Sequence, residues 1–121
     1  MTVQQIITRA DALKPNAVPE AEKIHWLSAL EAMIKNEIAD THDGWEEPVP
    51  TGEPLTPTDA LFAPPPYADA YVFWLLAKID FTNGEFDSYA NSTASFNSVY
   101  SAFADHVNRT KTPKNSKVNF G

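Results

Sequence analysis

Apolar side chains recur at helical spacing in four stretches of the chain, the first of which opens it. This stretch ends at Lys14-Pro15-Asn16, and its apolar positions are Val3, Ile6, Ile7, Ala10 and Leu13. They follow the i, i+3, i+4, i+7 rule of an amphipathic α-helix. Thr2 and Gln5 have the spacing of a capping box, so we expect the helix to begin directly after Thr2.

The second stretch begins at Pro19, in a position that proline favours at the start of a helix, and the acidic Glu20 and Glu22 follow it. Its apolar stripe consists of Ile24, Leu27, Leu30, Ile34 and Ile38. We expect this helix to stop near residues 40–44.

The last two stretches predict a third helix over residues 67–81 and a fourth over residues 85–109. The pair Asn83-Gly84 between them is a common signal for the end of a helix. The fourth is the most regular, with one largely aromatic seam along its whole length: Phe86, Tyr89, Thr93, Phe96, Tyr100, Phe103 and Val107.

The third helix is apolar on every side, because residues 71–77 are all aliphatic or aromatic and cover two helical turns. Such a helix must be covered all round, and three other helices in a small domain can hardly do that. One interpretation is that part of it contacts another subunit, through Tyr71, Phe73, Trp74 and Leu76. The alternative is that the proline-rich segment folds over it, using Leu61 and Phe62.

Residues 43–66 hold seven of the ten prolines, which predicts an extended loop that is too proline-rich for a helix and too polar for the core. A loop of this length in a small domain is often functional. No alternating pattern supports a sheet. We therefore expect an all-α fold, with one four-helix domain over residues 1–110 and an extended tail over residues 111–121.

Charge is distributed unevenly, within a formal net charge of −7. No Lys or Arg occurs between Lys35 and Lys78, whereas the segment after Arg109 is basic and has no acid. One interpretation is that the acidic stretch is a solubilising surface and the basic segment is a frayed chain end. The other is that the acidic and basic regions are two surfaces for two different partners. The overall charge argues against a protein whose whole surface binds nucleic acid.

Side chains suited to chemistry are scarce. The chain has no Cys, its four glycines are scattered singly, and no G-x-S-x-G motif is present. Asp40, His42 and Asp43 could offer ligands to a hard metal, but a histidine near a helix C-terminus is favoured by the helix dipole alone. We therefore expect no enzyme, no metal and no cofactor.

No segment is typical of a membrane protein or of secretion. The start of the chain lacks a basic, apolar secretory signal, and the longest apolar run has seven residues, against about 20 needed to span a bilayer. We expect a soluble protein made in a cytoplasm.

Three segments also resemble a known family: ITRADALKPNAV at 7–18, DTHDG at 40–44 and the run over 61–113. Its best markers are the Pro66-Tyr67 pair, the Ile79-Asp80 and Asn83-Gly84-Glu85 junction, and the stretch from Phe96 to Thr110. They resemble the phage head–tail connectors, small neck proteins of tailed phages and prophages of Gram-positive bacteria. Residues 45–59 match least.

The resemblance implies a structural virion protein at the head–tail junction, assembled in the host bacterial cytoplasm. Such an adaptor docks on the portal protein, forms a ring (typically of twelve copies) that extends the DNA channel, and offers a platform to the next neck, stopper or tail-completion protein. Duplex DNA would pass through without specific binding, and the acids that face the channel or its lower rim would be Glu46, Glu47 and Glu53.

In a connector, the tail over residues 111–121 would contact the portal. We expect it to be disordered in the free protein, because Pro113 and Asn115-Ser116 argue against a continued helix. Lys111, Lys114 and Lys117 would meet acids of the portal and Phe120 would fill an apolar pocket. The alternative is a solvated, expendable end.

Two other classes of function remain open. One is a small acidic helical regulator, of the antitoxin or host-takeover kind, that masks a basic surface as a compact monomer or dimer. The other is a hydrolase that uses His42 with its acidic neighbours.

Overall fold

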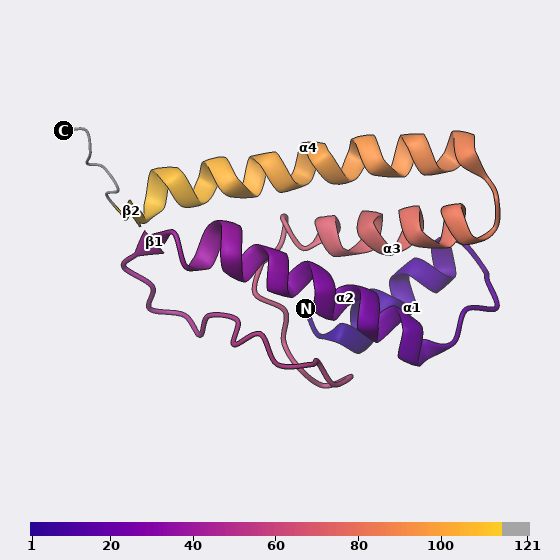
Figure 1. Ribbon diagram of the computed structural model, residues 1–121, viewed down its shortest axis with the longest axis horizontal. Coiled ribbons are helices and arrows are strands. Elements are labelled where there is room, and N and C mark those ends of the chain that lie inside the picture. The colour runs from indigo at the N-terminus through magenta and orange to yellow at the C-terminus, as the bar shows by residue number, and fades with distance from the viewer. Residues whose placement is uncertain (115–121) are drawn as a thin grey trace.

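Four α-helices in three layers form the protein in the computed structural model, which describes residues 1–114 (Figure 1). The helices are α1 (Val3–Leu13), α2 (Glu20–Ile34), α3 (Asp69–Thr82) and α4 (Phe86–Thr110). α3 lies in the middle, with α4 antiparallel along one side and α1 and α2 against the other. The prediction of an all-α fold is confirmed.

α1 begins as predicted, with a complete capping box. Gln5 donates its backbone N–H to Thr2 Oγ1 (3.2 Å), and Thr2 donates its own to Gln5 Oε1 (2.9 Å). The backbone N–H of Val3 donates to the carbonyl of Asp59, which lies in the long loop. The predicted stripe is buried up to Ala10, whereas Leu13 is 56% exposed.

α2 continues into a short π-helix, η1 (Lys35–Ala39), in which the backbone N–H of Asp40 donates to the carbonyl of Lys35 at 2.8 Å. Ile34 and Ile38 are buried on either side of this change. The apolar stripe therefore runs on through it, as predicted. The wider turn itself was not predicted, because apolar spacing does not resolve one π-turn from an α-turn.

The proline-rich loop contains no helix over residues 44–66, and it is fastened to the helices along its length. Leu55 donates its backbone N–H to Ser28 Oγ on α2 (3.1 Å), and Leu61 donates to the carbonyl of Met1 (2.9 Å). Leu61 and Ala63 are buried in the core, contrary to the expectation that the segment is too polar to enter it.

α3 is covered within its own chain over most of its surface. Its buried residues point to every side of the helix: Ala70, Tyr71, Val72, Leu75, Ala77, Ile79 and Asp80. The expectation that three helices can hardly cover it is corrected, because α1, α2 and α4 all pack on it and the loop adds Leu61 and Ala63 to the same core. Tyr71 is fully buried, so it packs inside its own chain and not against a second copy. Phe73, Trp74 and Leu76 are half-buried.

The seam of α4 faces the core over most of its length. Phe96, Phe103 and Val107 are buried, and Tyr100 donates its hydroxyl hydrogen to Glu37 Oε1 of η1 at 2.6 Å. Phe86, the first residue of the seam, is exposed. No helix within residues 1–114 is long and apolar enough to cross a bilayer.

A two-stranded antiparallel ribbon joins the end of η1 to the end of α4, at one end of the four-helix body (Figure 1). β1 (His42–Asp43) pairs with β2 (Thr112–Pro113), so that His42 lies opposite Pro113. No strand was expected here, because the pairing joins segments that are far apart in the sequence.

Candidate functional site

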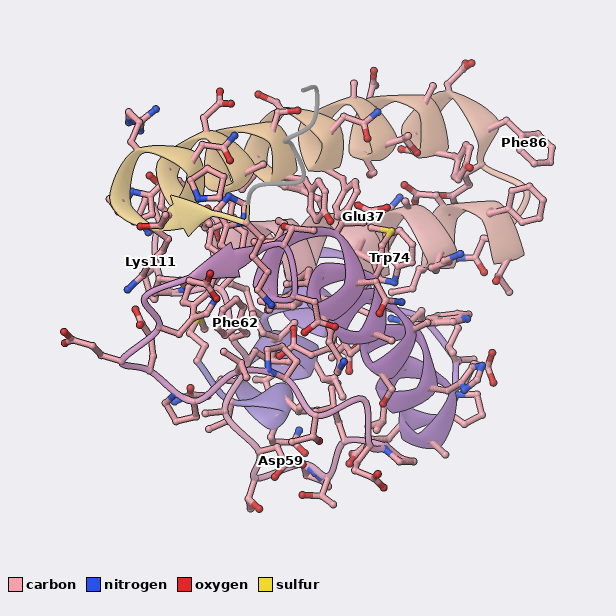
Figure 2. The ribbon with its side chains drawn as sticks, turned by 60° about the vertical axis from the view of Figure 1, so that its left-hand side comes forward. Glu37, Asp59, Phe62, Trp74, Phe86 and Lys111 are labelled. Carbon is pink, nitrogen blue, oxygen red and sulfur yellow. The ribbon has the colours of Figure 1, made fainter. Side chains whose placement is uncertain are left out.

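Three aromatic rings gather where α3 turns into α4, and we call Phe81, Phe86 and Tyr89 the turn cluster. Phe81 packs edge-on against Phe86 and Tyr89, with ring centroids 5.8 and 5.4 Å apart. Phe81 is 60% exposed and Phe86 is 62% exposed, and Figure 2 shows Phe86 projecting from the end of the molecule. Neighbouring exposed rings are typical of a surface that contacts another molecule.

The tight α3–α4 turn is what leaves these rings outside. α3 ends at Asn83-Gly84 as predicted, with Gly84 in the left-handed region at φ +74°. The backbone N–H of Gly84 donates to the carbonyl of Phe81, and that of Glu85 donates to the carbonyl of Asp80. The chain reverses so quickly that no segment is left to cover Phe81 and Phe86.

A buried carboxylate supports the turn from below. Asp80 is 1% exposed, forms an ion pair with Lys14 and accepts a hydrogen bond from Ser92 Oγ at 3.0 Å. Lys14 also pairs with Glu85 at 2.8 Å, and hydrogen bonds to Asp80 and then Glu85 raise the pKa of Lys14. The end of α1, the end of α3 and the start of α4 are thus held together beneath the turn cluster.

A second aromatic group lies at the other end of the molecule, and we call Trp45, Phe62, Tyr67, Phe103 and His106 the terminal cluster. Neighbouring ring centroids are 4.9 Å apart for Trp45–Phe62, 6.1 Å for Phe62–Phe103 and 5.5 Å for Tyr67–Phe103. Phe103 is buried, and the other members are half-buried. The cluster borders a hollow of about 340 Å³.

Lys111 closes the terminal cluster on one side. Its Nζ lies 5.1 Å from the centroid of the Trp45 ring, pairs with Glu47 Oε1 at 3.0 Å and donates to the carbonyl of Gly44. Lys111 is one of the residues predicted to contact a partner, and this stays a prediction; within the chain its charge pairs with Glu47.

The start of the predicted tail is also ordered against the body. Thr112 and Pro113 form β2, and the backbone N–H of Lys114 donates to the carbonyl of Thr41 at 2.8 Å. The prediction of disorder from residue 111 is therefore wrong for residues 111–114. The Lys114 residue is exposed. Lys117 and Phe120, the other residues predicted to contact the portal, lie outside the described residues.

The three acids predicted to face a DNA channel lie on the exposed loop but do not act alike. Glu47 accepts from its own backbone N–H and pairs with Lys111, and these contacts, in that order, lower its pKa. Glu46 and Glu53 are exposed, and within residues 1–114 neither forms an ion pair.

His42 is buried and holds the end of η1 against α4. Its Nδ1 lies 2.9 Å from the carbonyl oxygen of Ile38, and its Nε2 lies 2.7 Å from Asn108 Oδ1. Asp40, the acid considered beside it, pairs with Lys35. Residues 1–114 contain no group of three acidic or histidine side chains that could hold a metal ion.

A buried carboxylate that the sequence interpretation did not single out holds the loop onto the core. Glu31 Oε1 accepts from the Tyr71 hydroxyl at 2.6 Å, and Glu31 Oε2 accepts from the Phe62 backbone N–H at 2.8 Å. The Tyr71 oxygen accepts from the Ala63 N–H. Burial raises the pKa of Glu31, and burial followed by the charge of Glu31 raises the pKa of Tyr71. An acid at a stripe position between Leu30 and Ile34 was the signal in the sequence.

The ionisable groups that are buried in residues 1–114 each have a partner that explains their position. Glu31, His42 and Asp80 are described above, and Lys23 pairs with Asp11 at 2.7 Å. Two of the surfaces that residues 1–114 offer to another molecule are the exposed turn cluster and the hollow of the terminal cluster. Comparisons of the chain with protein-family models, with curated proteins and with solved structures found no match.

Proposed function

We propose that this chain is a head–tail connector of a tailed phage, which docks on the portal protein and offers a platform to the next neck protein. The resemblance of residues 7–18, 40–44 and 61–113 to that family supports it. The observation from the fold that carries the proposal is the turn cluster: Phe81 and Phe86 are 60% and 62% exposed on a rigid turn. An adaptor requires an exposed contact surface of this kind.

An adaptor needs two contact surfaces of different chemistry, and the chain has them at opposite ends. The turn cluster is aromatic, and the basic segment that begins at Arg109 leaves from the end where β2 lies (Figure 1). In the proposed arrangement, Lys114, Lys117 and Phe120 contact the portal. The turn cluster then faces away from the portal and contacts the next neck protein.

In the proposed ring, neighbouring copies contact each other through the residues of α3 that remain partly accessible in the single chain. Phe73 and Leu76 are half-buried and pack against the core with one side only. Trp74 is more constrained, because its ring packs on Phe96 at 5.1 Å and its Nε1 donates to the carbonyl of Trp26. We therefore place the subunit contact on Phe73 and Leu76 first.

The proposed ring should let DNA pass without holding it. The net charge of −7 opposes phosphate binding, and the exposed Glu46 and Glu53 would repel a duplex in the channel. We predict no measurable affinity for duplex DNA at physiological salt, in a titration of labelled duplex followed by fluorescence anisotropy. Tight, salt-sensitive binding would contradict the placement of these acids.

The proposal is tested with the portal protein of the phage or prophage whose genome encodes the chain. Electron microscopy of the mixture should show portal rings extended by a second ring, while the chain alone remains a small species in light scattering. A chain that stays monomeric in the presence of the portal would contradict the proposal and favour the acidic regulator.

The orientation is tested on portal-bearing heads. The double variant Phe81→Ser with Phe86→Ser should still bind the portal but should no longer support tail joining. Val49→Ser is the matched control, because Val49 is also apolar and 40% exposed but lies on the loop. If the double variant joins tails as well as the control does, the turn cluster does not contact the next neck protein.

A further inference from the structure

An open hollow lies beside the turn cluster, between the start of α2 and the end of α3. Its volume is about 420 Å³, and it is lined by Ala17, Val18, Pro19, Glu22, Trp26, Thr82 and Asn83. Thr82 and Asn83 also belong to the short segment that connects Phe81 to Phe86. The hollow and the turn cluster are therefore adjacent parts of one surface, at the end of the molecule where α2 begins and α3 turns into α4 (Figure 1).

The lining of this hollow includes a carboxylate that the described chain does not neutralise. Glu22 is exposed, and within residues 1–114 it forms no ion pair. Lys14, the base beneath the turn cluster, already pairs with Asp80 and Glu85. A positive charge that comes from another molecule would therefore find the Glu22 carboxylate available.

The aromatic ring of the hollow is that of Trp26, which follows Glu22 by one helical turn on the same side of α2. Trp26 is half-buried, and its backbone carbonyl accepts a hydrogen bond from Trp74 Nε1 at 2.9 Å, which ties this part of α2 to α3. Lys78, one turn before Thr82, lies over the Trp74 ring at 4.7 Å from its centroid. Of the described residues that line the hollow, none is a lysine or an arginine.

A carboxylate beside an indole ring suits arginine best among the basic side chains. The guanidinium group is planar, forms paired hydrogen bonds with a carboxylate and stacks on aromatic rings, whereas the ammonium group of lysine is a point charge. The apolar stem of an arginine also suits the walls formed by Val18 and Pro19. The exposed rings of Phe81 and Phe86, next to the hollow, suit an apolar side chain of the same partner.

We propose that the hollow binds an arginine of a partner protein, and that an apolar side chain beside this arginine packs on the turn cluster. The guanidinium group lies between Glu22 and Trp26 in this arrangement. The proposal deepens the proposed function and rests on it only for the identity of the partner, which is then the next neck protein. The contact surface of that protein should therefore carry an arginine beside an apolar residue.

The arginine site is tested on the full chain alone, with two short peptides. Acetyl-Phe-Arg-amide carries both proposed groups, and acetyl-Phe-citrulline-amide replaces the guanidinium by a neutral group of nearly the same shape. In an NMR titration of the isotope-enriched protein, the arginine peptide should shift the indole signal of Trp26 and the amide signals of Asn83 and Phe86. Its dissociation constant should be about threefold or more below that of the citrulline peptide, which lacks the charge.

A variant at the carboxylate shows whether the charge is read at this hollow. Glu22→Gln should weaken the binding of the arginine peptide by about threefold and leave that of the citrulline peptide unchanged. Glu20→Gln is the matched control, because Glu20 is also an exposed acid in the first turn of α2 but does not line the hollow. Equal affinity of the two peptides for the native chain would overturn the proposal and leave an apolar contact only. An arginine peptide that binds Glu22→Gln as tightly as the native chain would overturn it as well.

Portal-bearing heads separate this proposal from the connector function. Glu22→Gln should bind the portal as the native chain does but join fewer tails, whereas Glu20→Gln should join them normally. A chain that selects the arginine peptide but does not bind the portal would contradict the connector function and leave the arginine site standing. A chain that binds the portal and joins tails without selecting the arginine peptide would contradict the arginine site alone.

Discussion

The two ends of the molecule carry aromatic clusters of similar composition, yet one is open and the other is closed. At the α3–α4 turn, Phe81 and Phe86 are more than half exposed, whereas Phe103 in the terminal cluster is 3% exposed. The residue type does not account for the difference. The connections do: a tight turn has no chain left to cover its rings, while the long proline-rich loop brings Trp45 and Phe62 over Phe103.

The difference also bears on function, because covered rings stabilise the fold and uncovered rings remain for a partner. Both clusters contain residues from the same seam of α4. The seam is exposed at Phe86 and buried at Phe103. The polar contacts differ in the same way. At the closed end, Lys111 is placed over Trp45, whereas at the open end the ion pair of Lys14 with Asp80 lies beneath the rings.

The strongest test of this comparison makes the same change at both ends of α4. Phe103→Ala should lower the free energy of unfolding by about 3–5 kcal/mol, because it leaves a cavity in the core. Phe86→Ala should change it by less than about 0.5 kcal/mol, since the ring is exposed. Urea unfolding followed by circular dichroism measures both. Equal losses would mean that the turn cluster is part of the core.

A second test releases the loop that closes the terminal cluster. Tyr71→Phe removes the donor to Glu31 and the acceptor for the Ala63 N–H, and leaving these buried groups unpaired should cost about 1–3 kcal/mol. Tyr100→Phe is the control, because it removes a hydroxyl that bonds Glu37 in an exposed place, and should cost at most about 1 kcal/mol. Equal losses in the two variants would contradict a special role for the Glu31 contact.

The same carboxylate makes the closed end sensitive to pH. In the unfolded chain Glu31 should titrate near its usual value of 4.5, and burial raises the pKa in the fold. As the pH falls from neutral, the folded state takes up the proton before the unfolded state does, so the stability of the native chain should rise relative to that of Glu31→Gln. Stability should fall again as the pH rises through the folded pKa. A difference between the two chains that is independent of pH would contradict this.

The smallest expected effect comes from the lysine over the terminal cluster. Lys111→Ala removes an ion pair and a cation–π contact that are partly exposed, and should lower stability by about 1 kcal/mol or less. Lys114→Ala should leave the melting temperature unchanged, because only the backbone of Lys114 is bonded to the body. The loss of stability caused by Lys111→Ala should be smaller at high salt, because salt screens the ion pair that the variant lacks. A larger effect of Lys114→Ala would show that the closure extends along the tail.

The helices and their ends could be predicted because the signals are local. The Thr2 and Gln5 capping box and the Asn83-Gly84 terminator each act within a few residues, and the structure has both. The burial of a helix by other elements, in contrast, depends on residues that are distant in the sequence. The apolar sequence of α3 requires neighbours on every side but does not specify whose, and here the chain supplies them itself.

The candidate surfaces were predicted less well, for the same reason. Lys111 pairs with Glu47, and β2 pairs with β1, although the partners are far apart in the sequence. The distribution of charge along the sequence does not show which distant residues meet in the fold. Phe86 was placed on the buried seam, because spacing alone does not reveal that the partner helix ends beside it. Glu31 was not singled out either, although an acid beside an apolar stripe is a signal that the sequence does contain.

The start of α1 depends on a segment far from it in the sequence. Its first two free amides, those of Val3 and Gln4, donate to the carbonyls of Asp59 and Pro57 at 3.0 and 2.9 Å. Their hydrogen exchange therefore reports on opening of the long loop and not on fraying of the chain end. A protease cut in that loop would loosen α1 as well, so the N-terminal helix and the loop should open together as one cooperative unit.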